Sequence, residues 1–257
     1  MIHFVGAGAG APDLITLRGK KHLQEADIII YAGSLVNPKL LEYAKAACEI
    51  YNSARMTLEE VLEVMWGGEK RGLITVRLHT GDPCLYGALR EQMDMLDREG
   101  ISYDYCPGVS SFCGAASALN LEYTLPDVSQ SVIITRMEGQ TPVPPKESIQ
   151  SFAAHQATMV IFLSTGMLTE LSRRLIEGGY QEDTPSAIVY KATWEDEKSY
   201  ICTIGTLAKT AEENHIKKTA LIIVGDVVAH SDYMRSKLYD PDFTTEFRKG
   251  TEIKKVW

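Results

Sequence analysis

The sequence lacks the features that would place it at a membrane or on a nucleic acid. No apolar run approaches the ~20 residues that a membrane helix needs, and residues 1–6 lack the basic flank of a signal peptide. There is no dense run of Lys and Arg, and the formal net charge is −8. Since gripping a phosphate backbone requires clustered cations, nucleic-acid binding is not expected. We therefore expect a cytoplasmic protein whose partner is a small molecule.

The sequence also lacks the usual signatures of disulfide and metal sites. Its 5 cysteines are odd in number and form no C-x-x-C pair, and its 6 histidines show no H-x-x-x-H spacing. Scattered, odd cysteines fit free thiols in a reducing cytosol better than a disulfide framework. The prediction is therefore that the chain has no metal site.

What the first half does contain is a regular alternation of strand and helix patterns. Thr57 and Glu60 form a capping-box pattern at the start of one helix. Such alternation predicts a mostly parallel sheet with helices on both faces. Strands are expected at residues 2–5, 28–31, 48–51, 74–78 and 103–106, and helices at 14–24, 38–46, 57–70, 88–99 and 110–119.

The second half is richer in strands. Asp196 and Glu197 separate two expected strands without room for a helix, which predicts a partly antiparallel sheet. We therefore predict an α/β fold of two α/β domains, an N-terminal one with a mostly parallel sheet and a C-terminal one with a mixed sheet, and a ligand cleft between them. Strands are expected at residues 132–136, 158–162, 185–190, 197–203 and 220–224, and helices near 168–177 and 207–213.

The domain boundary is expected within residues 119–127, where Leu125-Pro126-Asp127 breaks the pattern. This gives an N-terminal domain over residues 1–119 and a C-terminal domain over residues 120–230. Residues 231–257 are charged and weakly periodic, and are expected to form a tail outside the core.

Three short, small-residue loops follow expected strands in the first half. They contain Gly6-Ala7-Gly8, Gly81-Asp82-Pro83 and Pro107-Gly108. Loops at the carboxyl ends of parallel strands lie along one rim, where open α/β sheets bind ligands. These loops carry no Lys or Arg for a phosphate, whereas Asp82 suits a cation. S-adenosylmethionine, which joins an adenosine, an amino acid and a sulfonium, fits this chemistry.

A dinucleotide is the competing interpretation of the first loop. Gly6, Gly8 and Ala11 match the G-x-G-x-x-A variant of the nucleotide fingerprint. However, Pro12 and Asp13 interrupt the helix start where a pyrophosphate would bind, and Asp13 adds a negative charge there. The second strand also lacks a following acidic residue, so nicotinamide binding is disfavoured.

Taken together, these motifs resemble the tetrapyrrole methylase family, the S-adenosylmethionine-dependent enzymes of corrin and sirohaem synthesis. The similarity extends over residues 2–229, through V-G-A-G-x-G-x-P-D-L-I-T at 5–16, H-T-G-D-P-x-L-Y-G at 79–87 and P-G-V-S-S at 107–111. The segments 31–36, 136–144 and 190–194 are most similar to the branch that methylates C11 of precorrin-4 or cobalt-precorrin-4. The resemblance implies that activity, S-adenosylmethionine as cofactor, S-adenosylhomocysteine as product, and usually a homodimer.

The resemblance also implies a set of cofactor-binding residues. Its members come from the three loops and from strand ends in the second half. The loop residue Ala9 departs from the proline of most relatives, and its loop is expected to face the tetrapyrrole. The methionine and ribose parts are assigned to Thr80, Gly81, Asp82 and Leu85, further cofactor contacts to Ser110 and Ser111, and the adenine to Leu163, Ala192, Ala220 and Leu221, with Ala9 completing the set.

The tetrapyrrole carboxylates require cations or hydrogen-bond donors. Candidates for substrate binding are His79, Tyr86, Arg136 and Lys191, while Arg55, Arg77 and Arg90 are further basic residues near the motifs. No catalytic residue is predicted, because the attacking carbon is activated by its own pyrrole ring. The alternatives are another C-methyltransferase of the corrin pathway and a non-catalytic module that binds the tetrapyrrole or the cofactor. RNA 2′-O-methyltransferases and diphthine synthases share the superfamily, but the acidic charge and the later motifs disfavour them.

Overall fold

The computed structural model describes residues 1–229 and 233–251 and divides them into two compact units. Unit 1 holds residues 1–119 together with two later segments, 189–199 and 219–221. Unit 2 holds residues 120–188, 200–218 and the described residues from 222 onward. Part of the expected tail, Ser231, Asp232 and residues 252–257, lies outside the described residues. Two segments from the second half thus pack with the first.

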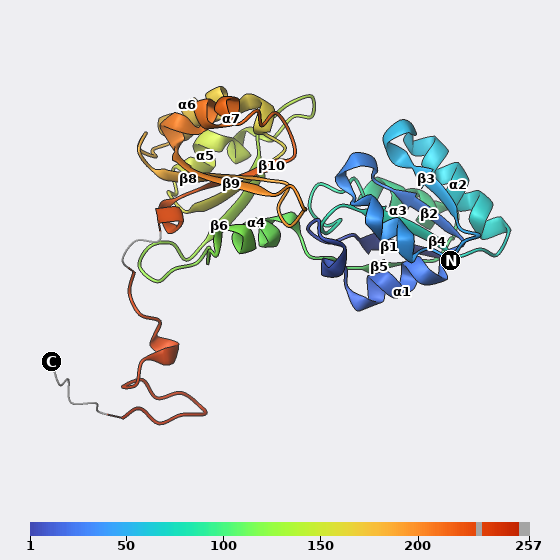
Figure 1. The fold of residues 1–257 in the computed structure, drawn as a ribbon, viewed down its shortest axis with the longest axis horizontal. Coiled ribbons are helices and arrows are strands. Elements are labelled where there is room, and N and C mark those ends of the chain that lie inside the picture. Colours follow the sequence, from blue (N-terminus) through green and yellow to red (C-terminus); the bar gives the residue numbers. More distant parts are fainter. Residues whose placement is uncertain (230–232, 252–257) are drawn as a thin grey trace. The chain divides into compact units, whose positions relative to one another are not determined.

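The core of unit 1 is a five-stranded sheet with the strand order β3-β2-β4-β1-β5 (Figure 1). Every recorded pair in it is parallel, which confirms the predicted parallel sheet. The order places β1 in the interior, between β4 and β5, so the loops that follow these three strands emerge side by side. The strands are β1 (Ile2–Gly6), β2 (Ile28–Tyr31), β3 (Glu49–Asn52), β4 (Thr75–His79) and β5 (Tyr103–Cys106).

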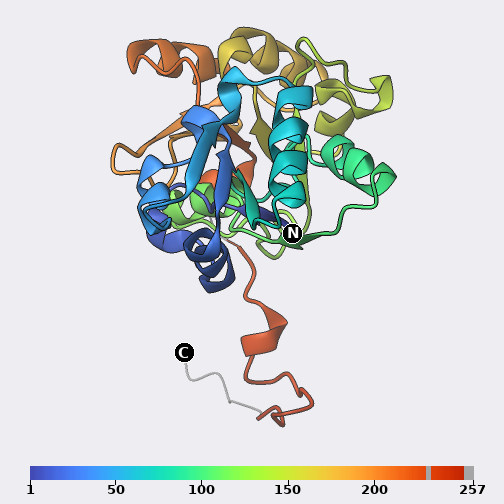
Figure 2. The same ribbon diagram turned by 90° about the vertical axis from the view of Figure 1, so that its right-hand side faces the viewer.

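Helices pack against both faces of this sheet because its strands are apolar on both sides. Phe4 lies in a cluster with residues of α2 and α3, whereas its neighbour Val5 lies in a cluster with Leu23 of α1. Successive strand residues point to opposite faces, so each strand contributes to both clusters. Figure 2 shows α2 running alongside the sheet. The helices are α1 (Leu17–Glu25), α2 (Leu58–Lys70), α3 (Arg90–Arg98) and α4 (Ser111–Leu119).

Capping side chains set where the helices of unit 1 begin. The predicted Thr57–Glu60 capping box is present, with both reciprocal hydrogen bonds. The expected start of α1 at residue 14 was wrong, because the Thr16 hydroxyl caps the helix by accepting from the Gly19 amide, and residues 12–14 form a separate 3-10 turn. The expected helix at 38–46 is likewise a 3-10 helix, Pro38–Tyr43, capped by Asn37.

Unit 2 is built on a five-stranded mixed sheet with the order β6-β7-β10-β8-β9. β7 pairs with β6 in parallel and with β10 antiparallel, which confirms the predicted mixed character. The strands are β6 (Val132–Arg136), β7 (Thr158–Phe162), β8 (Pro185–Tyr190), β9 (Lys198–Thr203) and β10 (Ala220–Val224), and the helices are α5 (Ile149–Ala153), α6 (Leu168–Glu177) and α7 (Leu207–Glu213). The sequence did not predict α5, which at one turn is too short for periodicity to reveal.

Within the described part of the chain, no helix is both long and apolar enough to cross a membrane.

Candidate functional site

Three loops meet at the carboxyl edge of the first sheet through backbone contacts. The amide of Ala7 donates to the carbonyl of His79 at 2.7 Å. Gly8 and Gly81 then exchange two hydrogen bonds, of 3.2 and 3.0 Å, in an isolated antiparallel bridge. The loop that follows β1 is therefore fixed directly to the loop that follows β4.

Glycine is required where these loops touch the third one. A Cβ on Gly6 would lie 2.6 Å from the backbone of Gly108, and a Cβ on Gly108 would lie 2.8 Å from the Cα of Gly6. Gly81 has a φ of +58°, in the left-handed region that favours glycine. The G-x-G and P-G motifs of the sequence are thus explained by loop-to-loop packing, which builds a rim of closely packed backbone and small side chains.

Asp82 joins the loop after β4 to the loop after β5. Its Oδ1 accepts from the amide of Cys84 at 2.9 Å and from the hydroxyl of Tyr105, and its Oδ2 accepts from the amide of Gly108 at 2.9 Å. Burial alone would raise the pKa of Asp82, but the hydrogen bonds from Tyr105 and two backbone amides outweigh it and hold the pKa below its usual value. The carboxylate is therefore ionised at neutral pH and fixed in place.

The other predicted residues of these loops lie around Asp82. The Thr80 hydroxyl donates to the carbonyl of Leu35, in the turn after β2. The Leu85 amide donates to the Asp82 carbonyl at 3.2 Å. A Cβ on Gly81 would be 3.3 Å from the Ser111 amide and 3.5 Å from the Cα of Ser110, so the structure brings these predicted residues together.

The segment 189–199, distant in sequence, packs on the first loop within unit 1. The amide of Ala11 donates to the Thr193 hydroxyl at 2.9 Å. The space beside Gly114 is bounded by the Cβ atoms of Ala9 and Ala192, so these two predicted residues lie close to one helix, α4. Both alanines are buried, at 8 and 6 % exposure. The first loop and this segment thus form one packed wall.

Lys191 and the residues next to β10 belong to the same wall. The Lys191 amide donates to the Thr219 carbonyl at 3.0 Å, which fixes the segment beside Ala220 and Leu221 at the start of β10. The Lys191 ammonium bonds Asp196 at 2.5 Å and lies 5.3 Å from the centre of the Trp194 ring. Its charge is therefore already partly balanced.

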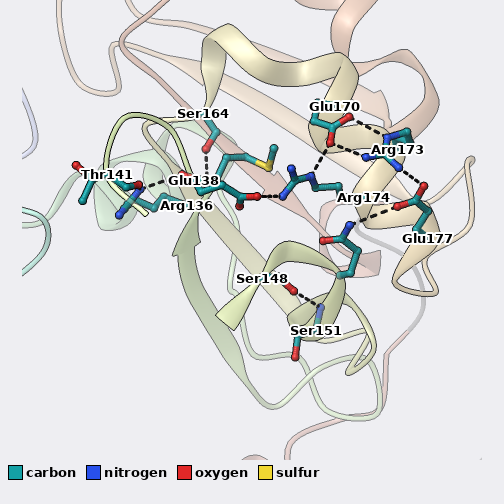
Figure 3. A network of polar contacts seen from close by, with 12 residues as sticks. Arg136, Glu138, Thr141, Ser148, Ser151, Ser164, Glu170, Arg173, Arg174 and Glu177 are labelled. Carbon is teal, nitrogen blue, oxygen red and sulfur yellow. Dashed lines mark hydrogen bonds and ion pairs between the residues drawn. The ribbon is translucent and has the colours of Figure 1, made fainter. Parts of the chain in front are cut away.

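Two predicted residues, Arg136 and Leu163, lie in unit 2 at the ends of neighbouring strands. Arg136 pairs in register with Phe162, directly before Leu163. Its guanidinium donates to the carbonyls of Met137 and Thr141 at 3.1 Å, and the described residues offer it no carboxylate (Figure 3). Leu163 has a φ of 54° and is 64 % exposed, an unusual pairing of backbone strain with an uncovered apolar side chain.

Figure 3 also shows what holds this strand end. The buried Ser164 hydroxyl donates to the Phe162 carbonyl at 2.7 Å and accepts from the Met137 amide at 2.9 Å. The next residue of that loop, Glu138, forms an ion pair with Arg174 of α6. The loop after β6 and the turn after β7 are therefore connected, and Arg136 and Leu163 are presented together.

The remaining candidates, His79 and Tyr86, differ in exposure. His79 is 3 % exposed, and its Nε2 is buried without a hydrogen-bond partner among the described residues. Burial, with Arg77 nearby, lowers the pKa of His79 to about 3, so the ring is neutral at physiological pH. Tyr86 is 45 % exposed, has a φ of 57°, and lines a cavity of about 550 Å³ with Ala88 and Leu89.

Sequence reasoning missed several residues that shape this edge. Tyr105 binds Asp82, the buried Asn37 donates its side-chain amide to the Gly10 carbonyl at 3.0 Å, and the Trp194 ring covers Gly10. Each joins segments far apart in the chain, which periodicity and local motifs do not reveal. Only the position of Tyr105 in the sequence could have indicated its role, because it directly precedes Cys106-Pro107-Gly108, where the third loop begins.

The profile of the family Tetrapyrrole (Corrin/Porphyrin) Methylases matches residues 1–208. The chain belongs to the tetrapyrrole (corrin/porphyrin) methylase family. It is 55 % identical to a cobalt-precorrin-4 C(11)-methyltransferase of Methanocaldococcus jannaschii over 246 residues, which cover 96 % of this chain and 95 % of that one. It is 44 % identical to a protein of the same name from Priestia megaterium, over 98 % of each chain.

A solved structure shares the fold. It is that of a cobalt precorrin-4 methyltransferase, described as a cobalamin biosynthetic enzyme. It superposes with a TM-score of 0.86 at 44 % identity, over 88 % of this chain and 95 % of that one. The family and the two-sheet α/β fold predicted from the sequence are therefore confirmed.

Proposed function

We propose that this protein transfers a methyl group from S-adenosylmethionine to C11 of cobalt-precorrin-4, in cobalamin biosynthesis. The observation that carries the proposal is the identity of 55 and 44 %, over nearly the whole chain, with two proteins that bear that activity in their names. The loop edge of the first sheet supports it, because its motif residues come together there in three dimensions.

The chemistry of that edge fits the cofactor. The small residues Gly81, Ser110 and Ser111 present no bulky side chain, which favours close approach of an amino-acid and ribose moiety, and the three loops carry no Lys or Arg. Asp82 is ionised and held by three donors, so its charge can favour a cation such as a sulfonium. The adenine is proposed to contact Leu163, which is exposed, together with Ala192 and the start of β10, which are buried.

In the reaction the cofactor supplies an electrophilic methyl group on its sulfonium. The chain's own residues hold donor and acceptor in line and exclude water, and such positioning can contribute about 7–11 kcal/mol. The packed loops suit this role, because backbone contacts among Gly6, Gly81 and Gly108 leave little freedom. No general base is assigned, since a pyrrole-derived carbon is already nucleophilic.

The substrate carboxylates are proposed to bind Lys191, Arg136 and Tyr86. Lys191 could exchange Asp196 for a substrate carboxylate, and Arg136 would do so while still bonded to its loop carbonyls. His79 belongs to the same sequence motif, but a neutral, buried ring offers no positive charge to a carboxylate. We propose that His79 does not contact the substrate, but packs at the buried end of strand β4 and so positions Thr80 and Gly81.

The wider assignment follows from the same family relationship. We propose two domains over residues 1–119 and 120–230, a homodimer, and a cytoplasmic location with no nucleic-acid or membrane partner. The five free cysteines suit a reducing compartment. A light-scattering mass of two chains would support the dimer, whereas a mass of one chain would contradict it.

The decisive experiment is an assay with both forms of the substrate. Purified protein is incubated with S-adenosylmethionine carrying a ¹³C methyl group and with either cobalt-precorrin-4 or metal-free precorrin-4. The proposal predicts one added methyl per tetrapyrrole, placed at C11 by NMR, with the cobalt form preferred. A methyl at another carbon would indicate a different corrin C-methyltransferase. Cofactor binding without transfer to either substrate would indicate a non-catalytic binding module.

A further inference from the structure

Two histidines and an aspartate converge at the other end of the first sheet, away from the loop edge. His3 lies on β1, His22 on α1 and Asp104 on β5, and one ligand atom from each lies within 4.8 Å of the others. The Nδ1 of His3 is 2.6 Å from the Oδ1 of Asp104. The two imidazole rings stack with centres 4.1 Å apart and planes 31° from each other.

The fold builds this cluster from three segments that are separate in sequence. His3 and Asp104 are register partners on the neighbouring parallel strands β1 and β5. His22 occupies the last turn of α1, the helix whose Leu23 packs in the same core cluster as Val5. His3 is near the beginning of β1 and Gly6 is at its end, about 10 Å further along at the usual rise of a strand. The cluster is therefore distinct from the loop edge.

The surroundings of the cluster are open and carry charges of both signs. A cavity of about 550 Å³ borders His22 and Asp104, and its wall includes Glu25, Arg18 and Lys21. The carboxylates of Asp104 and Glu25 thus share this wall with the cations of Arg18 and Lys21. The cavity leaves room for water, or for Glu25 itself, to complete a coordination shell.

We propose that His3, His22 and Asp104 bind one divalent ion of the late first transition row, such as Co²⁺, Ni²⁺, Cu²⁺ or Zn²⁺. Two imidazoles and one carboxylate are a donor set that these ions prefer, whereas Mg²⁺ and Ca²⁺ prefer oxygen alone. Bonds of about 2.0–2.2 Å to one ion bring its ligands to within roughly 4.2 Å of one another. Atoms already within 4.8 Å need only small side-chain rotations to reach this.

The competing explanation is a simple hydrogen-bonded pair, His3 with Asp104, on which His22 merely stacks. The two explanations differ in the role of His22. If His22 is a ligand, replacing it with Gln weakens ion binding. If His22 only packs against His3, the same replacement leaves the affinity for an ion unchanged.

The test is a titration of the full chain, without a histidine tag and stripped by a chelator, with Co²⁺. Visible absorption and calorimetry are recorded together, because the d–d bands of Co²⁺ report its coordination. We expect one Co²⁺ per chain, displaced by Zn²⁺. His22→Gln and Asp104→Asn are each expected to raise the dissociation constant at least about 10-fold, while His155→Gln, an exposed histidine of unit 2, leaves it unchanged.

The absence of saturable one-to-one binding would overturn the proposal, as would wild-type affinity in His22→Gln. Circular dichroism and the affinity for S-adenosylhomocysteine check that each variant is folded. His3 lies within strand β1 and is partly buried, so the substitutions of His22 and Asp104 decide the result. Because the readout is the ion itself, the outcome is independent of whether the chain methylates C11.

Discussion

The loops at the carboxyl ends of the strands are held together in different ways in the two sheets. In the first sheet the loops contact one another through their backbones, at Gly6, Gly8, Gly81 and Gly108. The partly buried carboxylate of Asp82 adds a hydrogen bond between two of these loops. In the second sheet, loops are joined by side chains, through Ser164 and a chain of partly exposed ion pairs from Glu138 to α6. Backbone contacts cannot yield to an added methyl group, whereas exposed ion pairs contribute little. The first edge should therefore tolerate far less change.

The largest effect is expected for Gly108→Ala. The new Cβ would lie 2.3 Å from the Gly81 carbonyl oxygen and within 3 Å of the Gly6 backbone. Moving the Gly108 loop away would break its hydrogen bond to Asp82, and moving the Gly6 loop would break the bridge between Gly8 and Gly81. We expect a loss of about 3 kcal/mol in the free energy of unfolding, measured by urea denaturation. The matched control is Gly67→Ala in α2, where nothing lies within 4 Å.

The control should be neutral or more stable by up to about 1 kcal/mol, because alanine favours a helix. Equal effects of the two substitutions would show that the loss of stability at Gly108 does not come from the contacts between the loops.

A pH-dependent effect should arise from His79. Its folded pKa of about 3 lies below the unfolded value of 6.5, so the unfolded chain binds an extra proton between these values. Stability should therefore be full above pH 6.5 and fall as the pH decreases toward 3, with a slope of up to about 1.4 kcal/mol per pH unit from this group. In His79→Gln that part of the slope should vanish. A His79 ring that titrates near pH 6.5 by NMR would contradict its burial.

A smaller effect on ligand binding should separate the two roles of Asp82. Asp82→Asn removes the charge and replaces one of the two accepting oxygens with a donor, whereas Tyr105→Phe removes one hydrogen bond and keeps the charge. We expect Asp82→Asn to weaken S-adenosylmethionine at least about 10-fold, equal to about 1.4 kcal/mol.

The same variant should weaken S-adenosylhomocysteine, which lacks the sulfonium charge, less, while Tyr105→Phe should weaken both ligands equally. Calorimetry measures all four affinities. Unchanged binding of both ligands in Asp82→Asn would exclude this carboxylate from the site.

The smallest effect is expected in the second sheet. Glu138→Gln removes an ion pair to Arg174 whose partners are both partly exposed, and Arg174 keeps its bond to Glu170 (Figure 3). The free energy of unfolding should change by less than about 1 kcal/mol. A loss in the free energy of unfolding as large as that of Gly108→Ala would show that side-chain ion pairs stabilise their loops as much as backbone contacts do.

The sequence predicted most of the fold, because the local signals were strong. The strands Ile28–Tyr31 and Tyr103–Cys106 and the helix Leu168–Glu177 match their predicted ranges. The differences arose where local rules compete. A proline favours a helix start at Pro12 and Pro38, yet the chain forms a 3-10 helix at each of these positions. The α-helix α1 begins only after the capping residue Thr16.

The candidate site was less accessible to sequence reasoning. The glycine motifs marked the loops, but their mutual contacts depend on the strand order, which places β1 between β4 and β5. The bond from Tyr105 to Asp82 and the cluster of His3, His22 and Asp104 are purely tertiary. A search for local histidine spacing could not find ligands that three different elements supply.

The most direct test of the account is amide hydrogen exchange with and without S-adenosylhomocysteine. We expect slower exchange on binding in peptides covering residues 80–85 and 107–113, with smaller changes at 189–194 and around Leu163. Peptides from α2 and α7 should not change. Saturating ligand that leaves residues 80–85 and 107–113 unprotected would contradict the placement of the methyl-donor site at the glycine-joined edge of the first sheet.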